Sequence, residues 1–387
     1  MHPRHLLREC LRNGLLPALA MVSATVASSA MAQPSPRASI VDVARAIRPL
    51  DHFPGFPAGS DYLGELMRPG SHARLRLATV GHLPLRPVAD VPLTGDATRW
   101  DYASLDPATH RLYLAHLGDS TVVVFDTQAQ KVVAEVSSVS HVHGVLFVPE
   151  LGRVYASATG SDEVVSIDPA TLKITARVPA GDYPDGMAYA PEVHKLYVSD
   201  EHGGTDTVID VRTNARVATI PLGGEVGNTQ YDPVSKHIFA NVQTRKQLVE
   251  IDPVTDRVVS RMDLPGAEGN HGLHIDPVTH LAFIACEEND KLIVVDLTRR
   301  SVVATFNVAK DPDVLAFDPA LGWLYVAGES GQVSLFQVEG KKVSLIGTDM
   351  LGPNAHVVAV DAGTHRAYFP LRSLAGKPRL RITEPKQ

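Results

Sequence analysis

The chain has 387 residues, of which 44% are hydrophobic and 20% are charged. This composition supports a large folded core and excludes a disordered or low-complexity protein. The formal net charge is −7 with neutral histidines, so the chain has no general basic field and nucleic-acid binding is not expected. Only two cysteines are present, which excludes a disulfide scaffold, a four-cysteine zinc site and the Cys-x-x-Cys-His attachment of haem c.

Residues 1–32 have the pattern of an export signal. Three arginines precede an apolar stretch over residues 14–30, and Ala30-Met31-Ala32 matches the A-x-A cleavage pattern. We therefore predict cleavage after Ala32 and a mature protein in the bacterial periplasm. The apolar stretch is short and contains Ser, Thr and Pro, so we expect no membrane span after cleavage; an uncleaved anchor is the alternative.

From residue 86 onward the sequence repeats with a period of about 42 residues. Seven equivalent positions, which we call the register positions, are separated by 42 to 44 residues: Asp106, Val148, Ala190, Asp232, Asp276, Asp318 and Asp361. Each repeat has four short segments rich in β-branched residues, with Asp-Pro, Gly-Asp or Asp-Thr turn signals between them. Four strands in about 42 residues are typical of one β-propeller blade.

We therefore predict an all-β fold, a seven-bladed β-propeller with four-stranded blades over residues 86–387. The strands of the first blade are expected at residues 102–105, 112–115, 121–125 and 131–136. The seventh repeat lacks a fourth strand at the C-terminus, whereas residues 86–93 resemble the fourth strands of other repeats. We expect this N-terminal strand to close the last blade, so that no sheet edge stays free. Residues 33–85 are then an N-terminal extension rather than a second domain.

One strand in each of several repeats carries a recognisable motif. Leu196-Tyr197-Val198-Ser199-Asp200 resembles the Tyr-Val-Thr-Asn repeat of the YVTN/YncE-like β-propeller proteins, and Leu324-Tyr325-Val326-Ala327-Gly328 is a variant of it. Pro184-Asp185-Gly186-Met187-Ala188 is similar to the start of that family's inner strand. The resemblance covers about residues 86–383 and implies the propeller architecture. It implies no particular activity, because propellers of this kind bind or catalyse quite different things.

Polar residues recur five positions before each register position, where the innermost strands are expected to begin at the mouth of the central channel. We call these the ring positions, and they are Asp101, His143, Asp185, Gly227, His271, Asp313 and His356. Because a propeller brings them to one axis, imidazoles and carboxylates are expected to converge there. Such a group suits a divalent metal ion or acid–base chemistry. The candidate metal ligands are His143, His271, His356 and Asp185; a ring that is merely solvated is the structural alternative.

Other polar residues fall on the same predicted face. Candidates for contact with a ligand are Asp101, Trp100, His141, Asn228, Asp313, His116, Glu287 and Arg372. His141-Val142-His143 is expected to place two imidazoles on one side of a strand, and Asn228 to serve the blade where Gly227 has no side chain. Trp100 either stacks on a ligand or packs in a loop. Cys286 is expected to be a buried, unreactive thiol.

A second class of histidines falls in the turns on the opposite face of the predicted propeller. Its members are His110, His194, His237, His280 and His365, most of them four residues after a register position. Their recurrence follows from the repeat itself, so we expect a structural role for them.

Three functions fit these patterns. The first is a periplasmic YVTN/YncE-like propeller that binds a ligand or a divalent metal ion at the channel mouth. The second is a metal-dependent lactonase or lyase that uses the same face, with the cation polarising a carbonyl group. The third is a protein-interaction scaffold with no catalytic role. No Gly-x-Gly-x-x-Gly or Walker motif is present, so we expect no nucleotide cofactor, and the expected partner is a small molecule or a protein on the channel-mouth face.

Overall fold

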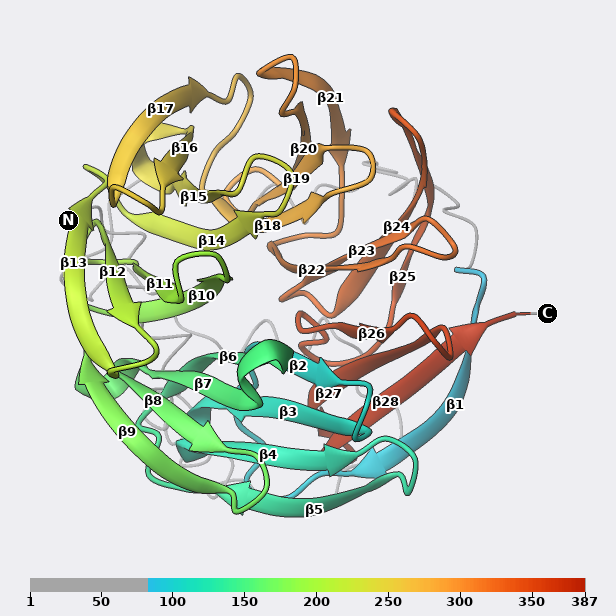
Figure 1. Ribbon diagram of the computed structural model, residues 1–387. Coiled ribbons are helices and arrows are strands. Elements are labelled where there is room, and N and C mark those ends of the chain that lie inside the picture. The colour runs from blue at the N-terminus through green and yellow to red at the C-terminus, as the bar shows by residue number, and fades with distance from the viewer. Residues whose placement is uncertain (1–82, 387) are drawn as a thin grey trace, which may run out of the picture. The chain divides into compact units, whose positions relative to one another are not determined.

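The computed structural model describes residues 83–386, which form seven four-stranded antiparallel sheets arranged as blades around an axis (Figure 1). The predicted all-β, seven-bladed propeller is confirmed. The predicted signal peptide and nearly all of the N-terminal extension lie outside the described residues. Within the described part of the chain, no helix is long and apolar enough to cross a membrane.

Each blade is a meander of consecutive strands, with the first strand innermost. Blade 1 consists of β2 (Ala103–Asp106), β3 (Arg111–His116), β4 (Thr121–Asp126) and β5 (Lys131–Val136). Blade 2 consists of β6 (Val142–Val148), β7 (Arg153–Ala158), β8 (Glu163–Asp168) and β9 (Lys173–Pro179). Blade 3 consists of β10 (Pro184–Ala190), β11 (Lys195–Asp200), β12 (Thr205–Asp210) and β13 (Ala215–Pro221). The strands expected in the first blade are thus confirmed to within one residue.

The remaining blades follow the same plan until the last. Blade 4 consists of β14 (Val226–Asp232), β15 (His237–Val242), β16 (Gln247–Asp252) and β17 (Arg257–Asp263). Blade 5 consists of β18 (Asn270–Asp276), β19 (Leu281–Cys286), β20 (Lys291–Asp296) and β21 (Ser301–Asn307). Blade 6 consists of β22 (Pro312–Asp318), β23 (Trp323–Gly328), β24 (Gln332–Glu339) and β25 (Lys342–Met350). Short 3-10 turns interrupt the loops at η2 (Leu117–Asp119), η3 (Pro149–Leu151), η4 (Thr159–Ser161) and η5 (Gln243–Arg245).

Blade 7 is built from both ends of the propeller sequence. Its inner three strands are β26 (Ala359–Asp361), β27 (Arg366–Leu374) and β28 (Lys377–Pro385), and β1 (Leu85–Pro92) pairs antiparallel with β28 as the outer strand (Figure 1). Arg381 on β28 makes a bidentate ion pair with Asp90 on β1, at 2.7 Å for each bond. The predicted closure by the N-terminal strand is therefore confirmed.

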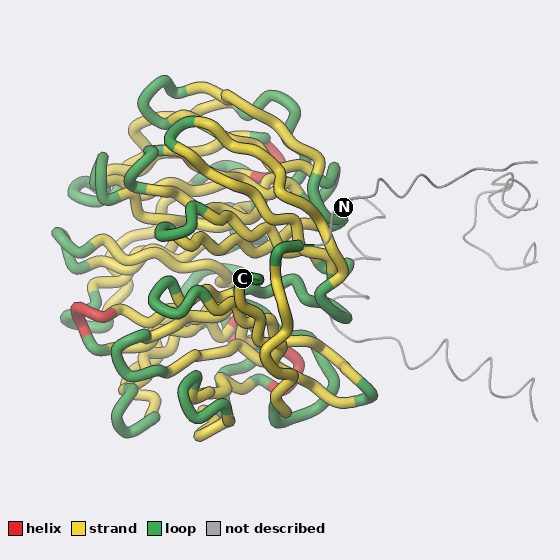
Figure 2. The backbone as a smooth tube through the Cα atoms, turned by 90° about the vertical axis from the view of Figure 1, so that its right-hand side faces the viewer, coloured by secondary structure: helices red, strands yellow, loops and turns green. Residues whose placement is uncertain are grey.

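The recurrent aspartates shape the turns between strands. The carboxylate of Asp106 accepts a hydrogen bond from the backbone N–H of Ala108 at 3.0 Å, and Asp232 and Asp276 accept equivalent bonds in their own blades. Four residues after Asp106 the chain needs a left-handed residue, and His110 takes that conformation with φ of 56°. Aspartate favours this turn because its side chain mimics a backbone turn. These three aspartates each end an inner strand, so their turns lie at the same end of the blades. Figure 2 shows the loops gathered at the two ends of the strands.

The opposite-face histidines have the structural roles expected of them. His194, His280 and His365 occupy the same left-handed turn position as His110, whereas His237 is the first residue of β15. His280 Nε2 lies 2.9 Å from Oδ2 of Asp232, and His365 Nδ1 lies 2.8 Å from Oδ2 of Asp318. Each of these ion pairs joins one blade to the blade before it.

The hydrophobic core consists of layers between adjacent blades. One layer joins blades 1 and 2 and includes Tyr113, Val124, Val145 and Ile167; another joins blades 5 and 6. The middle strands, such as β3 and β4, are apolar and buried along nearly their whole length, because each of their two faces packs against a neighbouring blade. The axis itself is thereby left to the polar ring positions.

Between blades 3 and 4 the core holds a buried acid. Asp206 on β12 is fully buried, and Thr229 Oγ1 donates to its Oδ2 at 3.0 Å. Burial, together with the nearby charge of Asp200, raises the pKa of Asp206 well above its ordinary value. The folded protein therefore holds this proton more tightly than the unfolded chain does.

We predict that Asp206→Asn changes how stability depends on pH. A raised carboxyl pKa gives stability that is complete below the unfolded pKa of about 3.9 and is lost as pH rises toward the folded pKa. The free energy of unfolding of the wild type should fall relative to Asp206→Asn, by about 1.4 kcal/mol per pH unit within that window. Denaturant titrations from pH 4 to pH 8 measure this difference.

The matched control is Asp210→Asn on the same strand. Hydrogen bonding and charge from Arg212 lower the pKa of Asp210 to about 2, so its ionisation is complete throughout that range. The difference in free energy of unfolding between the wild type and Asp210→Asn should stay constant from pH 5 to pH 8. A constant difference for Asp206→Asn as well would contradict the prediction.

Candidate functional site

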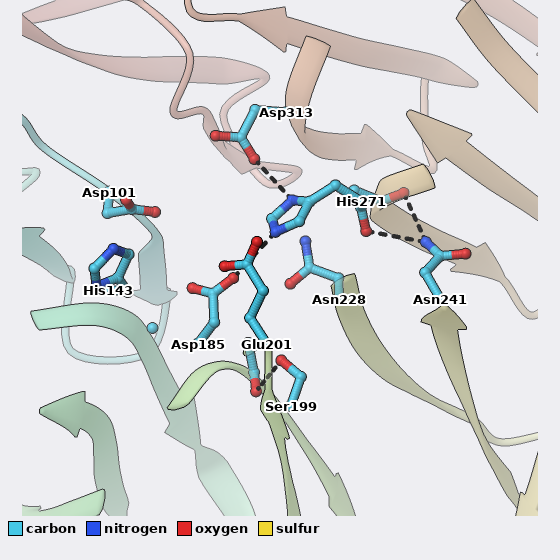
Figure 3. A network of polar contacts seen from close by, with 12 residues as sticks. Asp101, His143, Asp185, Ser199, Glu201, Asn228, Asn241, His271 and Asp313 are labelled. Atoms are coloured by element: carbon cyan, nitrogen blue, oxygen red, sulfur yellow. Dashed lines mark hydrogen bonds and ion pairs between the residues drawn. The ribbon is translucent and has the colours of Figure 1, made fainter. Parts of the chain in front are cut away.

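The candidate site lies where the inner strands begin, and β-bulges shape it. In blades 2 to 6 the pairing of the inner strand with the second strand shifts register at the ring position. His143, Asp185, His271 and Asp313 all lie in these bulges. A bulge redirects the side chain that it carries, and the side chains of these residues turn toward one another around the axis (Figure 3).

Glycine follows the ring residue in three blades because a larger residue has no room there. A Cβ atom on Gly272 would lie 1.9 Å from the carbonyl oxygen of Asp313, and one on Gly144 would lie 2.2 Å from that of Asp185. Real Cβ atoms do not approach other atoms so closely. The glycines therefore allow neighbouring inner strands to pack backbone against backbone at the axis.

Side chains of the second strands hold the ring backbone in place. Ser157 Oγ donates to the carbonyl oxygen of Asp185 at 2.8 Å. Asn241 Nδ2 donates to the carbonyl oxygen of His271 at 2.9 Å (Figure 3). The backbone of these ring residues is thus fixed by hydrogen bonds from inside the blades, which limits how far their side chains can move.

His271 is the centre of the polar group. Its Nε2 lies 3.2 Å from Oδ2 of Asp185, and its Nδ1 lies 3.3 Å from Oδ1 of Asp313 (Figure 3). Nδ1 also lies 3.5 Å from Oε1 of Glu287. Burial alone lowers the pKa of His271, but Glu287, Asp185 and Asp313 together raise it well above the ordinary value. The imidazole is therefore protonated at neutral pH unless another cation takes the place of a proton.

Two sets of side chains around His271 have metal-ligand geometry. Asp185, Glu201 and His271 form one set, and His271, Glu287 and Asp313 form the other; within each set the ligand atoms lie within 4.8 Å of one another. All five residues are more than nine-tenths buried. Of the ligands predicted from sequence, the structure brings Asp185 and His271 together and places His143 and His356 in neither set.

Arg99 lies on the Nδ1 side of His271. Its guanidinium contacts Asp101 at 3.2 Å and Asp313 at 3.5 Å, and it also pairs with Glu329. Burial raises the pKa of Asp101, and Arg99 opposes that shift. The pKa of Asp313 lies below its ordinary value because the hydrogen bond and charge of His271, with help from Arg99, outweigh the effect of burial.

His143 is engaged by an aromatic residue at the rim of the site. Its Nδ1 lies 2.9 Å from the carbonyl oxygen of His141, so that nitrogen carries the proton and donates. Its Nε2 lies 3.0 Å from the hydroxyl of Tyr183, whose ring also packs against the exposed His202 with centroids 4.1 Å apart. His143 on blade 2 thus fixes the hydroxyl of Tyr183, which precedes blade 3.

The expected pairing of two imidazoles on one side of a strand is wrong. His141 precedes β6 and has a left-handed φ of 42°, so it does not share the alternation of the strand. Its side chain is exposed, whereas that of His143 is buried. The reason is that the inner strand begins one residue later than the sequence pattern suggests.

His356 and Asn228 lie at other points of the ring. Nδ1 of His356 lies 3.1 Å from the carbonyl oxygen of Asn354, and its Nε2 lies 3.8 Å from Oδ2 of Asp313. Burial and the charge of Arg99 lower the pKa of His356. Asn228 Nδ2 donates to the hydroxyl of Tyr102 at 2.7 Å, which links blade 4 to blade 1 across the ring.

Three of the ligand-contact candidates are engaged by the protein itself. Trp100 is fully buried and stacks on His116, with ring centroids 3.8 Å apart and planes 6° from parallel. Nε2 of His116 lies 2.9 Å from Oγ1 of Thr98. Arg372 is exposed and donates to the carbonyl oxygen of Ala97 at 3.4 Å. Trp100 therefore packs in the core, one of the two alternatives weighed for it.

Cys286 has the buried environment expected of an unreactive thiol. It is the last residue of β19 and is fully buried in the core between blades 4 and 5. Burial raises the pKa of its thiol to about 12. The thiolate, which is the reactive form, is therefore negligible at neutral pH.

Three residues that shape the site were not predicted from the sequence. Arg99, Tyr102 and Tyr183 sit within two residues of a ring position, so their proximity to the axis could have been inferred. Their roles had no such signal, because each contacts blades remote in sequence. Arg99 pairs with Glu329, 230 residues away, and Tyr102 bonds to Asn228, 126 residues away.

No protein-family model and no curated protein sequence matches this chain. Solved structures do resemble it. Hydrazine synthase of Kuenenia stuttgartiensis superposes with a TM-score of 0.64 at 16% identity over 72% of this chain and 94% of that one. Virginiamycin B lyase from Staphylococcus aureus gives a TM-score of 0.65 at 9% identity, and the match covers 77% of this chain and 99% of the lyase. A structure of streptogramin B lyase gives a TM-score of 0.64 at 9% identity and covers 78% of this chain and 97% of that one. At these identities the likeness shows the propeller fold alone.

Proposed function

We propose that this protein is an exported β-propeller of the YVTN/YncE type that binds one divalent cation through Asp185, Glu201 and His271. The observation that carries the proposal is the geometry of these three side chains: their ligand atoms lie within 4.8 Å of one another, and all three residues are more than nine-tenths buried. Two further buried carboxyl groups, those of Glu287 and Asp313, lie on the other side of the same imidazole. Burying carboxylates is costly, and a bound cation reduces that cost.

Of the two sets around His271, the one with Asp185 is the better cation site. No described residue donates a hydrogen bond to Oδ1 of Asp185, although that atom is buried. The other set contains Asp313, which already contacts the guanidinium of Arg99. A cation on the Asp185 side avoids repulsion from Arg99 and gives the buried carboxylate oxygen a partner.

Asp313 and Glu287 of the other set then form an outer layer, which contacts His271 and not the cation. Metal-bound histidines commonly donate their second ring N–H to a carboxylate, which fixes the ring and increases its basicity. With the cation on Nε2, Nδ1–H of His271 faces Asp313 and Glu287 in that arrangement. One imidazole and two carboxylates suit a first-row divalent cation such as Zn²⁺ or Mn²⁺. Binding releases the proton that His271 otherwise holds.

Cation binding is tested by elemental analysis of the mature protein, purified without chelator or a histidine tag. We expect one equivalent of a divalent cation in the wild type. Asp185→Asn keeps the side-chain shape but removes a charged ligand, so its affinity should fall by more than the roughly 10–100-fold that outer-layer changes cost. Titration of the apo-protein with Zn²⁺ and Mn²⁺ measures both values.

Glu287→Gln is the matched control, because it alters a buried carboxylate on the other side of the same imidazole. It should retain one equivalent, with a smaller loss of affinity than Asp185→Asn. A wild type that binds neither ion, with circular dichroism showing a folded protein, would refute the site. Equal losses in the two variants would contradict the choice between the sets.

A second candidate function is metal-dependent opening of a lactone or another ester by a lyase or lactonase. Three protein ligands leave coordination positions for water or a substrate carbonyl, which is the arrangement of catalytic rather than structural sites. Two of the similar folds are named as lyases.

Turnover of a lactone panel separates an enzyme from a binding protein. An enzyme should lose at least about 100-fold in kcat/KM when Asp185→Asn removes the cation, and excess Zn²⁺ should not restore it. The opposite-face variant His110→Asn should be fully active. Cation binding without turnover of any lactone would support the binding function and contradict the enzymatic one.

The export part of the proposal rests on the N-terminal pattern. If Ala30-Met31-Ala32 is a cleavage site, the protein recovered from a periplasmic fraction should have Gln33 as its first residue. Intact mass spectrometry and N-terminal sequencing of that fraction test this. Recovery of the uncleaved chain, or of protein in the cytoplasmic fraction only, would contradict export.

A further inference from the structure

The buried carboxylates at the axis form two charged halves that share His271. On one side of the imidazole are Asp185 and Glu201, and on the other are Asp313 and Glu287. The two sets have the same composition, one imidazole nitrogen and two carboxylates, and both are more than nine-tenths buried. Ligand chemistry alone therefore gives no reason for a cation to choose one side.

Arg99 breaks this equivalence. Its guanidinium is 13% exposed at the side chain and reaches Asp101 at 3.2 Å and Asp313 at 3.5 Å, with Glu329 as a third carboxylate partner. The ion pair that the structure gives Asp185 is, by contrast, with His271 itself. A permanently positive side chain thus lies beside one set and away from the other.

We propose that the guanidinium of Arg99 supplies the positive charge that a second metal ion would otherwise supply beside Asp313. The site is therefore limited to one ion, which binds on the Asp185 side. This rests on the proposed cation-binding function and adds the residue that sets its stoichiometry. Arg99 does not touch the bound ion. It fixes the carboxylate of Asp313 and places a positive charge where a second ion would have to bind.

Two further observations support this role. Nε2 of His356 is buried and has no hydrogen-bond partner among the described residues, so a nitrogen atom on this side has unused capacity for a ligand. Nε2 of His356 lies 3.8 Å from Oδ2 of Asp313, the same oxygen that faces Arg99. Removing the guanidinium would take away the positive charge that faces Oδ2 of Asp313.

The test is the metal stoichiometry of Arg99→Gln, measured by elemental analysis after saturation with Zn²⁺ and by calorimetric titration of the apo-protein. We expect two equivalents of Zn²⁺ in Arg99→Gln, compared with one in the wild type and one in Arg99→Lys, which keeps the charge. The control Arg372→Gln removes an exposed arginine from the channel-mouth face and should bind one equivalent.

Combining variants separates this inference from the proposed function. Asp185→Asn alone should bind Zn²⁺ only weakly, whereas Asp185→Asn combined with Arg99→Gln should bind one equivalent tightly at the second set. Adding Glu287→Gln to that pair should weaken this binding. If the wild type binds no ion, the proposed function fails. If the wild type binds one ion and Arg99→Gln also binds one, the role of Arg99 is overturned.

The stability of Arg99→Gln provides a second readout. The variant should unfold at a lower temperature than the wild type in chelator, because three carboxylates lose their partner, and millimolar Zn²⁺ should raise its Tm more than it raises that of the wild type. An Arg99→Gln protein that does not fold even with Zn²⁺ would also overturn the inference, because an ion that can replace the guanidinium restores the charge balance.

Discussion

The constraint on which the site depends is the close approach of the inner strands around the axis. At Gly272 and Gly144 the neighbouring backbone leaves no space for even a Cβ atom. Such packing converts seven sheets into one rigid ring and forces the side chains of the adjacent bulged residues inward. Polar residues from blades far apart in sequence consequently share one buried centre, where charge matters far more than it would on the surface.

Electrostatics then decides what this centre can hold. His271 lies between two carboxylate sets, and Arg99 sits beside one of them. The asymmetry set by Arg99 links the function we propose for the Asp185 side with the stoichiometry that we infer for the whole centre.

The sequence predicted the architecture in detail because the architecture is periodic. Register positions 42 to 44 residues apart, together with the missing fourth strand, were enough to infer the number of blades and their closure. The same periodicity predicted that Asp185 and His271 both lie at the axis. It could not show which ring residues touch, because that depends on bulge geometry and rotamers. His141 and His143 illustrate the limit: one residue's difference in where β6 begins separates their side chains. Arg99 was missed for another reason, since its partners lie in other blades and no spacing rule connects them.

The pairing of β1 with β28 has a consequence for how the chain reaches its folded state. Paired residues such as Leu85 and Pro385 are 300 residues apart, so this pairing closes the longest loop in the described part of the chain. A blade made from consecutive strands can assemble locally, but blade 7 waits until both ends of the repeat region are available. Folding therefore cannot finish before β28 is available to pair with β1. Until then, blade 7 has an exposed strand edge.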